Sequence, residues 1–270
     1  MNLLSAIALG VLQGITEFLP ISSSGHLALA ESFFRIDQGG LAFDVALHMG
    51  TLLAVAIYFR RDFLLMFTGL VRPGALGAEA PQQRLLLLAI CLGTFPAVIA
   101  GLFLKDAVEN IFRAPVFIAC FLAGVGLLLL LADRLGRHHR SLKTIGLADA
   151  VLIGLAQALA LMPGVSRSGI TMTAGLMLGF NRMSAARFSF LLSAPVILGA
   201  GVFNLPEMIR HGSEPGQLGF YLAGFTAAAV SGYLVIAFLL RFVQSHSFAV
   251  FAYYRFVLAG LVLLQIWMGL

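Results

Sequence analysis

Four apolar runs constrain this chain more than any other feature, because each is long enough to cross a lipid bilayer. They span residues 85–104, 116–132, 220–240 and 248–267. A transmembrane helix needs about 20 predominantly apolar residues to cross roughly 30 Å of hydrocarbon. Two shorter runs, residues 42–59 and 188–203, can serve as further spans. The sequence therefore predicts an all-α integral membrane protein with about six transmembrane helices.

The composition agrees with a membrane protein and argues against a nucleic-acid partner. The chain is 60% hydrophobic and 11% charged, whereas soluble domains carry about 25% charged residues. Its net charge of +5 does not form one basic patch, since the basic residues alternate with the spans as topology signals do. The set expected on the cytoplasmic face is Arg60, Arg61, Arg72, Arg84, Arg134, Arg137, Arg140, Lys143, Arg182, Arg187 and Arg241. Cys91 and Cys120 lie inside apolar spans, and we expect both to pack as small hydrophobic residues.

Two segments of the chain are similar over sixteen residues without a gap. GVLQGITEFLPISSSG spans residues 10–25, and GLAQALALMPGVSRSG spans residues 154–169. Three spans follow each segment, and because three is odd, the second copy would lie upside down relative to the first. This pattern is typical of an inverted-topology repeat. We therefore expect one membrane domain over residues 1–270, built of two inverted repeats at approximately residues 1–133 and 144–270.

The first polar segment is predicted to be a re-entrant helical hairpin. A helix over residues 2–17 would be about 24 Å long, too short to cross. It should end before Pro20, because the residue preceding a proline is pushed out of the α region. Ser22, Ser23 and Ser24 can then cap a second short helix that runs to about residue 34.

The second segment should form a matching hairpin from the other face. We expect a helix over residues 148–162, a break at Pro163 and Gly164, and a helix over residues 168–179. Irregular backbone at membrane depth is tolerated only where it is buried in protein or faces a water-filled cavity. The tips of the two hairpins should therefore meet around such a cavity.

The first hairpin carries a set of polar groups that indicates chemistry. Gln13 and Glu17 are four residues apart and share one helix face. An ionisable residue in an apolar segment is a functional-site hypothesis, although Glu17 alone could also be a protonated structural residue. His26 could be a hydrogen-bonded core histidine, but beside serines and a carboxylate we favour general acid or base work. His48 has no such polar neighbours in sequence, and we interpret it as a packing residue or a polar contact.

The serines at both tips predict an anion site. A single serine before a helix is usually only a cap, but several free N–H groups at a helix start can bind an anion. The second tip adds Arg167, whose planar fork suits phosphate oxygens. A divalent cation would be held by Glu17, with Gln13 as a neutral ligand. Together these groups indicate phosphoryl chemistry on a lipid phosphate.

At these residues the sequence resembles the undecaprenyl-diphosphate phosphatases, also called bacitracin-resistance proteins. The similar motifs are QGITEFLPISSSGH at residues 13–26 and PGVSRSG at residues 163–169, and FDVALHMGTLLAV also matches. The resemblance implies hydrolysis of undecaprenyl diphosphate to the monophosphate at the outer face of the bacterial inner membrane. It also implies a requirement for Mg²⁺ or Ca²⁺ and a homodimer.

The resemblance also assigns roles to individual residues. By position, Glu17 and Gln13 match the acidic motif and Ser23 matches the proposed nucleophile. His26 matches the proposed acid or base, and Arg167 matches the arginine that binds the diphosphate. Further substrate-binding positions are Ser22, Ser24, Gly25, Ser166, Ser168 and Thr171. Many family members carry Glu where this chain has Gln13, so Glu17 must do the acidic work alone.

Three alternatives remain open from the sequence. Water could attack the phosphorus directly, with Ser23 only positioning it. Either Glu17 or His26 could accept the proton. Because inverted repeats and opposed hairpins are also transporter architecture, the chain could instead move a polyprenyl phosphate across the bilayer.

Overall fold

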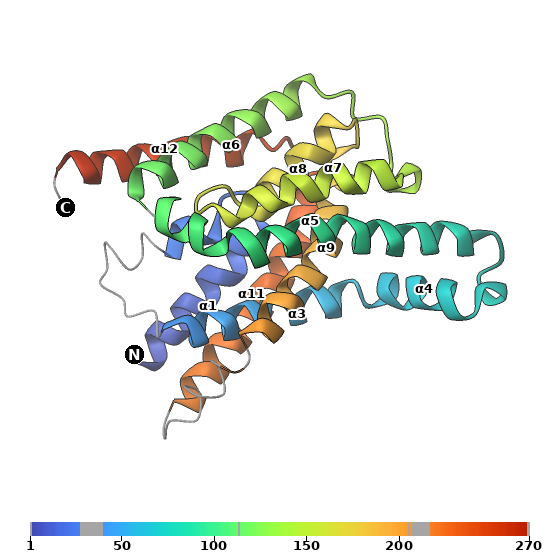
Figure 1. Cartoon of the computed structure of the whole chain (residues 1–270), viewed down its shortest axis with the longest axis horizontal. Coiled ribbons are helices and arrows are strands. Elements are labelled where there is room, and N and C mark those ends of the chain that lie inside the picture. The colour runs from blue at the N-terminus through green and yellow to red at the C-terminus, as the bar shows by residue number, and fades with distance from the viewer. Residues whose placement is uncertain (1, 28–39, 113, 205, 207–216, 269–270) are drawn as a thin grey trace.

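The computed structural model describes residues 2–27, 40–112, 114–204, 206 and 217–268, and the named elements in these ranges are all helices (Figure 1). Within them, five helices are long and apolar enough to cross a membrane: α5 (Ala80–Phe112), α6 (Pro115–Leu135), α9 (Arg182–Phe203), α11 (Leu218–Phe242) and α12 (Ala249–Trp267). A sixth span is formed if α3 (Gly40–Tyr58) and α4 (Arg60–Val71), which meet at a 70° bend, are counted together. The prediction of an all-α membrane protein with about six spans is confirmed.

The first broken segment follows the predicted pattern. Helix α1 (Leu3–Phe18) is capped by Asn2, whose Oδ1 accepts the N–H of Ser5 at 2.7 Å. It ends at Leu19, which takes an extended conformation directly before Pro20, as the steric restriction on a residue before proline requires. A new helix begins at Ser23 and is described as far as residue 27. Its predicted end near residue 34 lies outside the described residues.

The second broken segment repeats this plan. Helix α7 (Leu147–Ala158) continues into the 3₁₀ turn η4 (Leu159–Leu161), and helix α8 (Arg167–Met177) begins after the break. These bounds lie within a few residues of the predicted ones. Gly164 occupies the break with φ +94°, a left-handed conformation that suits glycine because it lacks a Cβ atom.

Each broken segment packs against a long helix from the other half of the chain. Helix α1 lies along α11, and α7 lies along α5 (Figure 1). A Cβ atom on Gly10 would lie 2.4 Å from the carbonyl oxygen of Gly224, and one on Gly154 would lie 2.4 Å from that of Gly93. Both close approaches therefore require glycine. These reciprocal contacts are compatible with an inverted repeat, whose boundaries stay a prediction.

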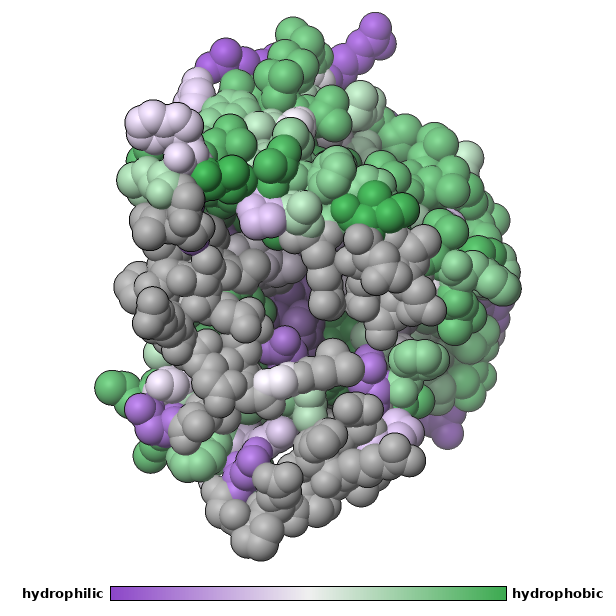
Figure 2. All heavy atoms as spheres, turned by 60° about the vertical axis from the view of Figure 1, so that its left-hand side comes forward, coloured by the Kyte–Doolittle hydropathy of each residue, from purple (hydrophilic) through white to green (hydrophobic). Residues whose placement is uncertain are grey.

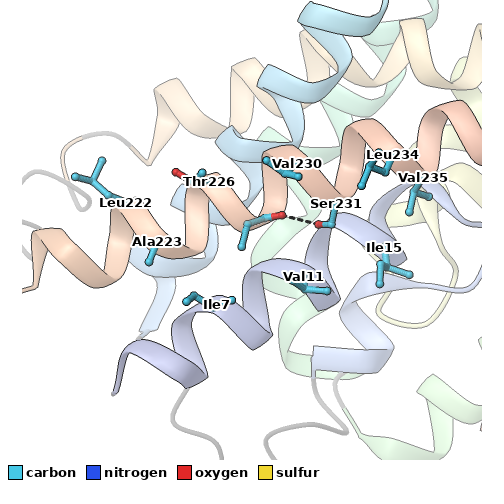
Figure 3. A pocket seen from close by; sticks show the side chains of 11 residues that line it. Ile7, Val11, Ile15, Leu222, Ala223, Thr226, Val230, Ser231, Leu234 and Val235 are labelled. Atoms are coloured by element: carbon cyan, nitrogen blue, oxygen red, sulfur yellow. Dashed lines mark hydrogen bonds between the residues drawn. The ribbon is translucent and has the colours of Figure 1, made fainter.

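The α1–α11 pair also borders an apolar groove of about 930 Å³ on the outer surface (Figure 3). Ile7, Val11 and Ile15 line it from α1, and Leu222 and Val230 are among the residues that line it from α11. Thr226 and Ser231 are the two residues with hydroxyl groups that line it, and the hydroxyl of Ser231 donates to the backbone carbonyl of Ala227 at 2.6 Å. None of the predicted site residues lines this groove.

The prediction for the two cysteines is wrong. Cys91 on α5 and Cys120 on α6 are exposed on the surface of the protein. In a membrane protein the surrounding lipid is as apolar as a protein core. An apolar run therefore does not tell which of its residues are packed inside.

Three ion pairs join arginines of the predicted cytoplasmic set to aspartates. They are Arg182–Asp133, Arg140–Asp149 and Arg187–Asp62. Burial alone would raise the pKa of Asp149, but hydrogen bonds from Arg140 and from the N–H of Gly146 lower it below its usual value. On the predicted cytoplasmic face, ion pairs therefore connect helices and loops to one another.

Candidate active site

The tips of the two broken segments contact each other, as the sequence analysis expected. The hydroxyl oxygen of Ser24 accepts the N–H of Gly164 at 3.4 Å, and the hydroxyl of Ser168 donates to the carbonyl of Leu19 at 2.9 Å. Each tip thus bonds to the break of the other. Figure 2 shows a hollow on one face of the protein with hydrophilic residues at its bottom.

The backbone at the two tips has the same unusual geometry. Ser22 and Ser166 have φ values of 76° and 70°, in the left-handed region that residues other than glycine rarely adopt. Each serine hydroxyl then accepts the N–H of the residue three positions later, Gly25 at 3.4 Å and Gly169 at 3.1 Å. Strained backbone of this kind concentrates at functional sites.

This geometry leaves free donors at both helix starts. Among the described residues, no hydrogen-bond partner is seen for the N–H groups of Ser23, Ser24, Arg167 and Ser168. Unpaired N–H groups at a helix start, together with the helix dipole, favour a bound anion. Two such helix starts lie at the contact between the tips.

Glu17 is the centre of the polar contacts. Its Oε2 accepts from Nε2 of Gln13 and from the hydroxyl of Ser23, both at 3.0 Å, and its Oε1 accepts from Nη2 of Arg167 at 2.7 Å. The carboxylate is 8% exposed. The predicted shared face of Gln13 and Glu17 is therefore confirmed, and the second segment supplies the cation that meets this carboxylate.

Arg167 keeps donors free for a ligand. Its Nη1 donates to the carbonyl of Ser189 at 3.1 Å, so that two of its five N–H groups are engaged in the described structure. Thr171, predicted as a substrate-binding residue, is buried, and its hydroxyl contacts the carbonyl of Arg167 at 2.8 Å and the hydroxyl of Ser189 at 2.7 Å. The hydroxyl of Thr171 therefore links the first turn of α8, which begins at Arg167, to Ser189 on α9.

His26 makes its contacts away from Glu17. Its Nδ1 lies 2.7 Å from the carbonyl oxygen of Ser22, and its Nε2 lies 2.7 Å from the hydroxyl of Tyr254, with the two rings stacked. A carbonyl only accepts, so Nδ1 carries the proton and Nε2 of the neutral ring accepts from Tyr254. The described contacts of His26 do not include Ser23. Any acid or base role would therefore act through the pair with Tyr254, which the sequence analysis did not select.

His48 makes a polar contact, which was one of the two roles expected for it, but the sequence did not indicate that its neighbour would be Glu17. Helix α3 brings its Nε2 to 3.7 Å from Oε2 of Glu17, and its Nδ1 lies 2.8 Å from the carbonyl oxygen of Asp44. The sequence could not show this contact, because the two residues lie on different helices. His48 therefore joins the group around Glu17.

Arg255 is a second residue that the sequence analysis missed. It is fully buried on α12 and donates to five backbone carbonyls. These carbonyls belong to Pro20, Phe121, Leu122, Gly164 and Val165. One guanidinium thus binds the break of both segments. The available signal was an arginine within an apolar span, which is a functional hypothesis by default.

The donor set around Glu17 fits a hard divalent cation in its chemistry. Among the described residues, no three His, Cys, Asp or Glu side chains gather in one place. However, Oε1 of Gln13 is buried and has no hydrogen-bond partner in this part of the chain. Carboxylate and amide oxygens are the ligands that Mg²⁺ and Ca²⁺ prefer. Glu17 and Gln13 therefore remain the residues that would hold such an ion.

These features define a multi-pass membrane protein with a buried polar cluster between two broken helical segments. A family described as "Bacitracin resistance protein BacA" matches residues 6–261, and the chain belongs to this family. An undecaprenyl-diphosphatase of Rubrobacter xylanophilus is 50% identical over 97% of both chains. That of Geobacter sulfurreducens is 48% identical over 97% of this chain and 98% of the relative. That of Geotalea daltonii is 46% identical over 100% of each chain.

Proposed function

We propose that this protein is an undecaprenyl-diphosphate phosphatase, which hydrolyses the terminal phosphate and leaves undecaprenyl phosphate. The observation that carries this proposal is the hydrogen bond from the hydroxyl of Ser23 to Oε2 of Glu17, at 3.0 Å, beside Arg167. In this proposal Ser23 is the nucleophile, Glu17 is the proton acceptor and Arg167 is the cation that binds the phosphate. The relatives at 46–50% identity carry the name of this activity.

The arrangement suits a lipid diphosphate. A diphosphate can bind the free N–H groups at the two helix starts and the remaining donors of Arg167. The surface of the surrounding helices is rich in exposed hydrophobic residues, so the polyprenyl tail can stay in the bilayer. The headgroup would then reach Arg167 and the two helix starts.

In the proposed reaction, Oγ of Ser23 attacks the terminal phosphorus while its proton passes to Glu17. The bond from this phosphorus to the bridging oxygen breaks, and undecaprenyl phosphate leaves. Water then hydrolyses the phosphoserine and releases inorganic phosphate. Arg167 and the backbone N–H groups stabilise the charge on the transferred phosphoryl group.

A divalent cation, Mg²⁺ or Ca²⁺, would neutralise the charge that develops on the phosphate oxygens. Within this proposal the protein is a homodimer in the bacterial inner membrane. In this proposal its site faces the outer side and Arg140, Arg182 and Arg187 face the cytoplasm, as the positive-inside rule favours.

The direct test measures inorganic phosphate released from undecaprenyl diphosphate by the purified protein in detergent. We expect release with Mg²⁺ or Ca²⁺ and none after addition of a chelator. Absence of release with either cation would refute the phosphatase and leave the transporter interpretation.

The nucleophile can be tested by rapid acid quenching followed by mass spectrometry of the peptides. A phosphoserine at Ser23 is expected in the wild type, and the Ser24→Ala variant should still form it. If Ser23→Ala retains most of the phosphate release, water attacks directly and Ser23 only positions it.

A further inference from the structure

The imidazole of His48 faces the carboxylate of Glu17. Because the carbonyl of Asp44 accepts from Nδ1 of His48 at 2.8 Å, Nε2 of the neutral ring presents a lone pair. This lone pair lies 3.7 Å from Oε2 of Glu17, too far for a hydrogen bond. Two acceptors held in this way are stable when a cation lies between them.

Gln13 gives a second, independent sign of a missing partner. Its side chain is 0% exposed, and its Oε1 has no hydrogen-bond partner among the described residues. The Nε2 of the same amide lies 3.0 Å from Oε2 of Glu17. A half-turn of the amide exchanges its nitrogen and oxygen and would bring Oε1 to the position near Oε2 of Glu17 that Nε2 now occupies. A buried acceptor without a partner in a native structure calls for an explanation, such as an ion.

We propose that His48 is a direct ligand of the divalent cation, with Oε2 of Glu17 and Oε1 of Gln13 as the other protein ligands. This rests on the proposed phosphatase site and adds the third ligand to it. Nε2 of His48 and Oε2 of Glu17, 3.7 Å apart, are close enough together that both would bind the same ion. Arg167 uses Oε1 of Glu17, the other oxygen.

The neighbours of the three ligands are arranged as in a metal site. A ligating histidine usually donates its second ring N–H to a carbonyl or carboxylate, which fixes the tautomer, and Asp44 receives this bond. The hydroxyl of Ser23 also donates to Oε2 of Glu17, and this bond can stay in place because a carboxylate oxygen has a second lone pair for an ion. Phosphate oxygens of the substrate would complete the coordination.

The imidazole changes which ion the site prefers. Imidazole nitrogen suits transition-metal ions, whereas Ca²⁺ takes oxygen ligands. We therefore expect His48 to strengthen the binding of Mn²⁺ and to contribute little to the binding of Ca²⁺. Removal of this one side chain should change the selectivity of the site among cations.

Pulsed electron paramagnetic resonance with Mn²⁺ alone tests this ligand without turnover. In the purified protein in detergent, bound Mn²⁺ should show coupling to a directly coordinated imidazole nitrogen. His48→Ala should abolish the coupling and weaken Mn²⁺ binding by about tenfold or more, with the affinity for Ca²⁺ unchanged.

Matched variants identify the ligands. The coupling should persist in His26→Ala, the other histidine near the tips. Gln13→Ala should weaken Mn²⁺ binding, whereas Gln157→Ala, at the equivalent position of the second segment and with the same unpartnered amide oxygen, should not. Mn²⁺ bound without imidazole coupling, or coupling that persists in His48→Ala, would overturn the assignment. Coupling in a protein that releases no phosphate would instead refute only the proposed function.

Discussion

The two broken segments share a backbone but divide the chemistry between them. Ser22 and Ser166 both take left-handed φ values, and both use the hydroxyl to cap a glycine three residues later. The positions that carry reactive groups differ: Glu17 is matched by Leu161, Ser23 by Arg167, and His26 by Ile170. The shared residues therefore build two helix starts, and the differing ones provide carboxylate and nucleophile on one side and the cation on the other.

The contacts between the segments follow the same division. Shared residues make the reciprocal bonds between backbone and hydroxyl groups, such as those of Ser24 with Gly164 and Ser168 with Leu19. The bond between Glu17 and Arg167, at 2.7 Å, joins two residues that have no counterpart of the same type. Two variants at an aligned pair of shared positions should therefore lower stability by equal amounts. At an aligned pair of differing positions, only the variant that removes a reactive group should lower activity.

The largest expected effect comes from Glu17 and its counterpart Leu161. Glu17→Gln removes the proton acceptor and the charged cation ligand, so phosphate release should fall by about a thousandfold or more. Leu161→Gln places the same amide in the second segment and should leave release within a few-fold of the wild type. Both rates are measured as inorganic phosphate from undecaprenyl diphosphate. Equal losses in the two variants would contradict the division of roles.

A smaller effect, a loss of stability, is expected from replacing Arg255, whose guanidinium group binds the breaks of both segments. Arg255→Met leaves the buried carbonyls of Pro20, Gly164 and Val165 without this donor, whereas those of Phe121 and Leu122 lie inside helix α6. Since one unsatisfied buried group costs about 1–3 kcal/mol, we expect a total loss of at least about 3 kcal/mol.

Thermal unfolding in detergent measures this loss, and the Tm should fall by roughly 5–10 °C. Arg255→Lys, which keeps the charge but has only three donors, should lie between the methionine variant and the wild type. A methionine variant that melts with the wild type would show that the breaks hold together without this residue.

The smallest expected effect concerns the two capping serines. Ser22→Ala and Ser166→Ala each remove one helix cap and should each cost about 1 kcal/mol of stability. The two losses should be alike, because the caps are alike, and denaturant unfolding followed by circular dichroism can compare them. A loss confined to one variant would break the structural equivalence of the tips.

The sequence predicted the parts of this molecule that depend on local chain properties. Apolar runs of membrane length predicted the spans, and Pro20 predicted the end of α1 within two residues. The spacing of Gln13 and Glu17 predicted their shared face, because four residues make about one helical turn. The motif pairing also indicated that Arg167 would come to the same site.

The sequence did not predict the contacts that His48, Tyr254 and Arg255 make with residues on distant helices. His48 reaches Glu17 only because α3 packs beside α1, and Tyr254 reaches His26 from α12, 228 residues away in the chain. The burial of Arg255 depends on both breaks and on α6 at once. These groups are set by tertiary packing, which no local spacing encodes.

The most direct test of the proposed function is hydrolysis of undecaprenyl diphosphate in water enriched in oxygen-18, followed by mass spectrometry of both products. Attack at the terminal phosphorus, through phosphoserine or by water, places the label in inorganic phosphate and leaves undecaprenyl phosphate unlabelled. This is the result that the account predicts. Label in the lipid monophosphate would contradict it. So would the absence of any labelled product from folded wild-type protein with Mg²⁺ or Ca²⁺.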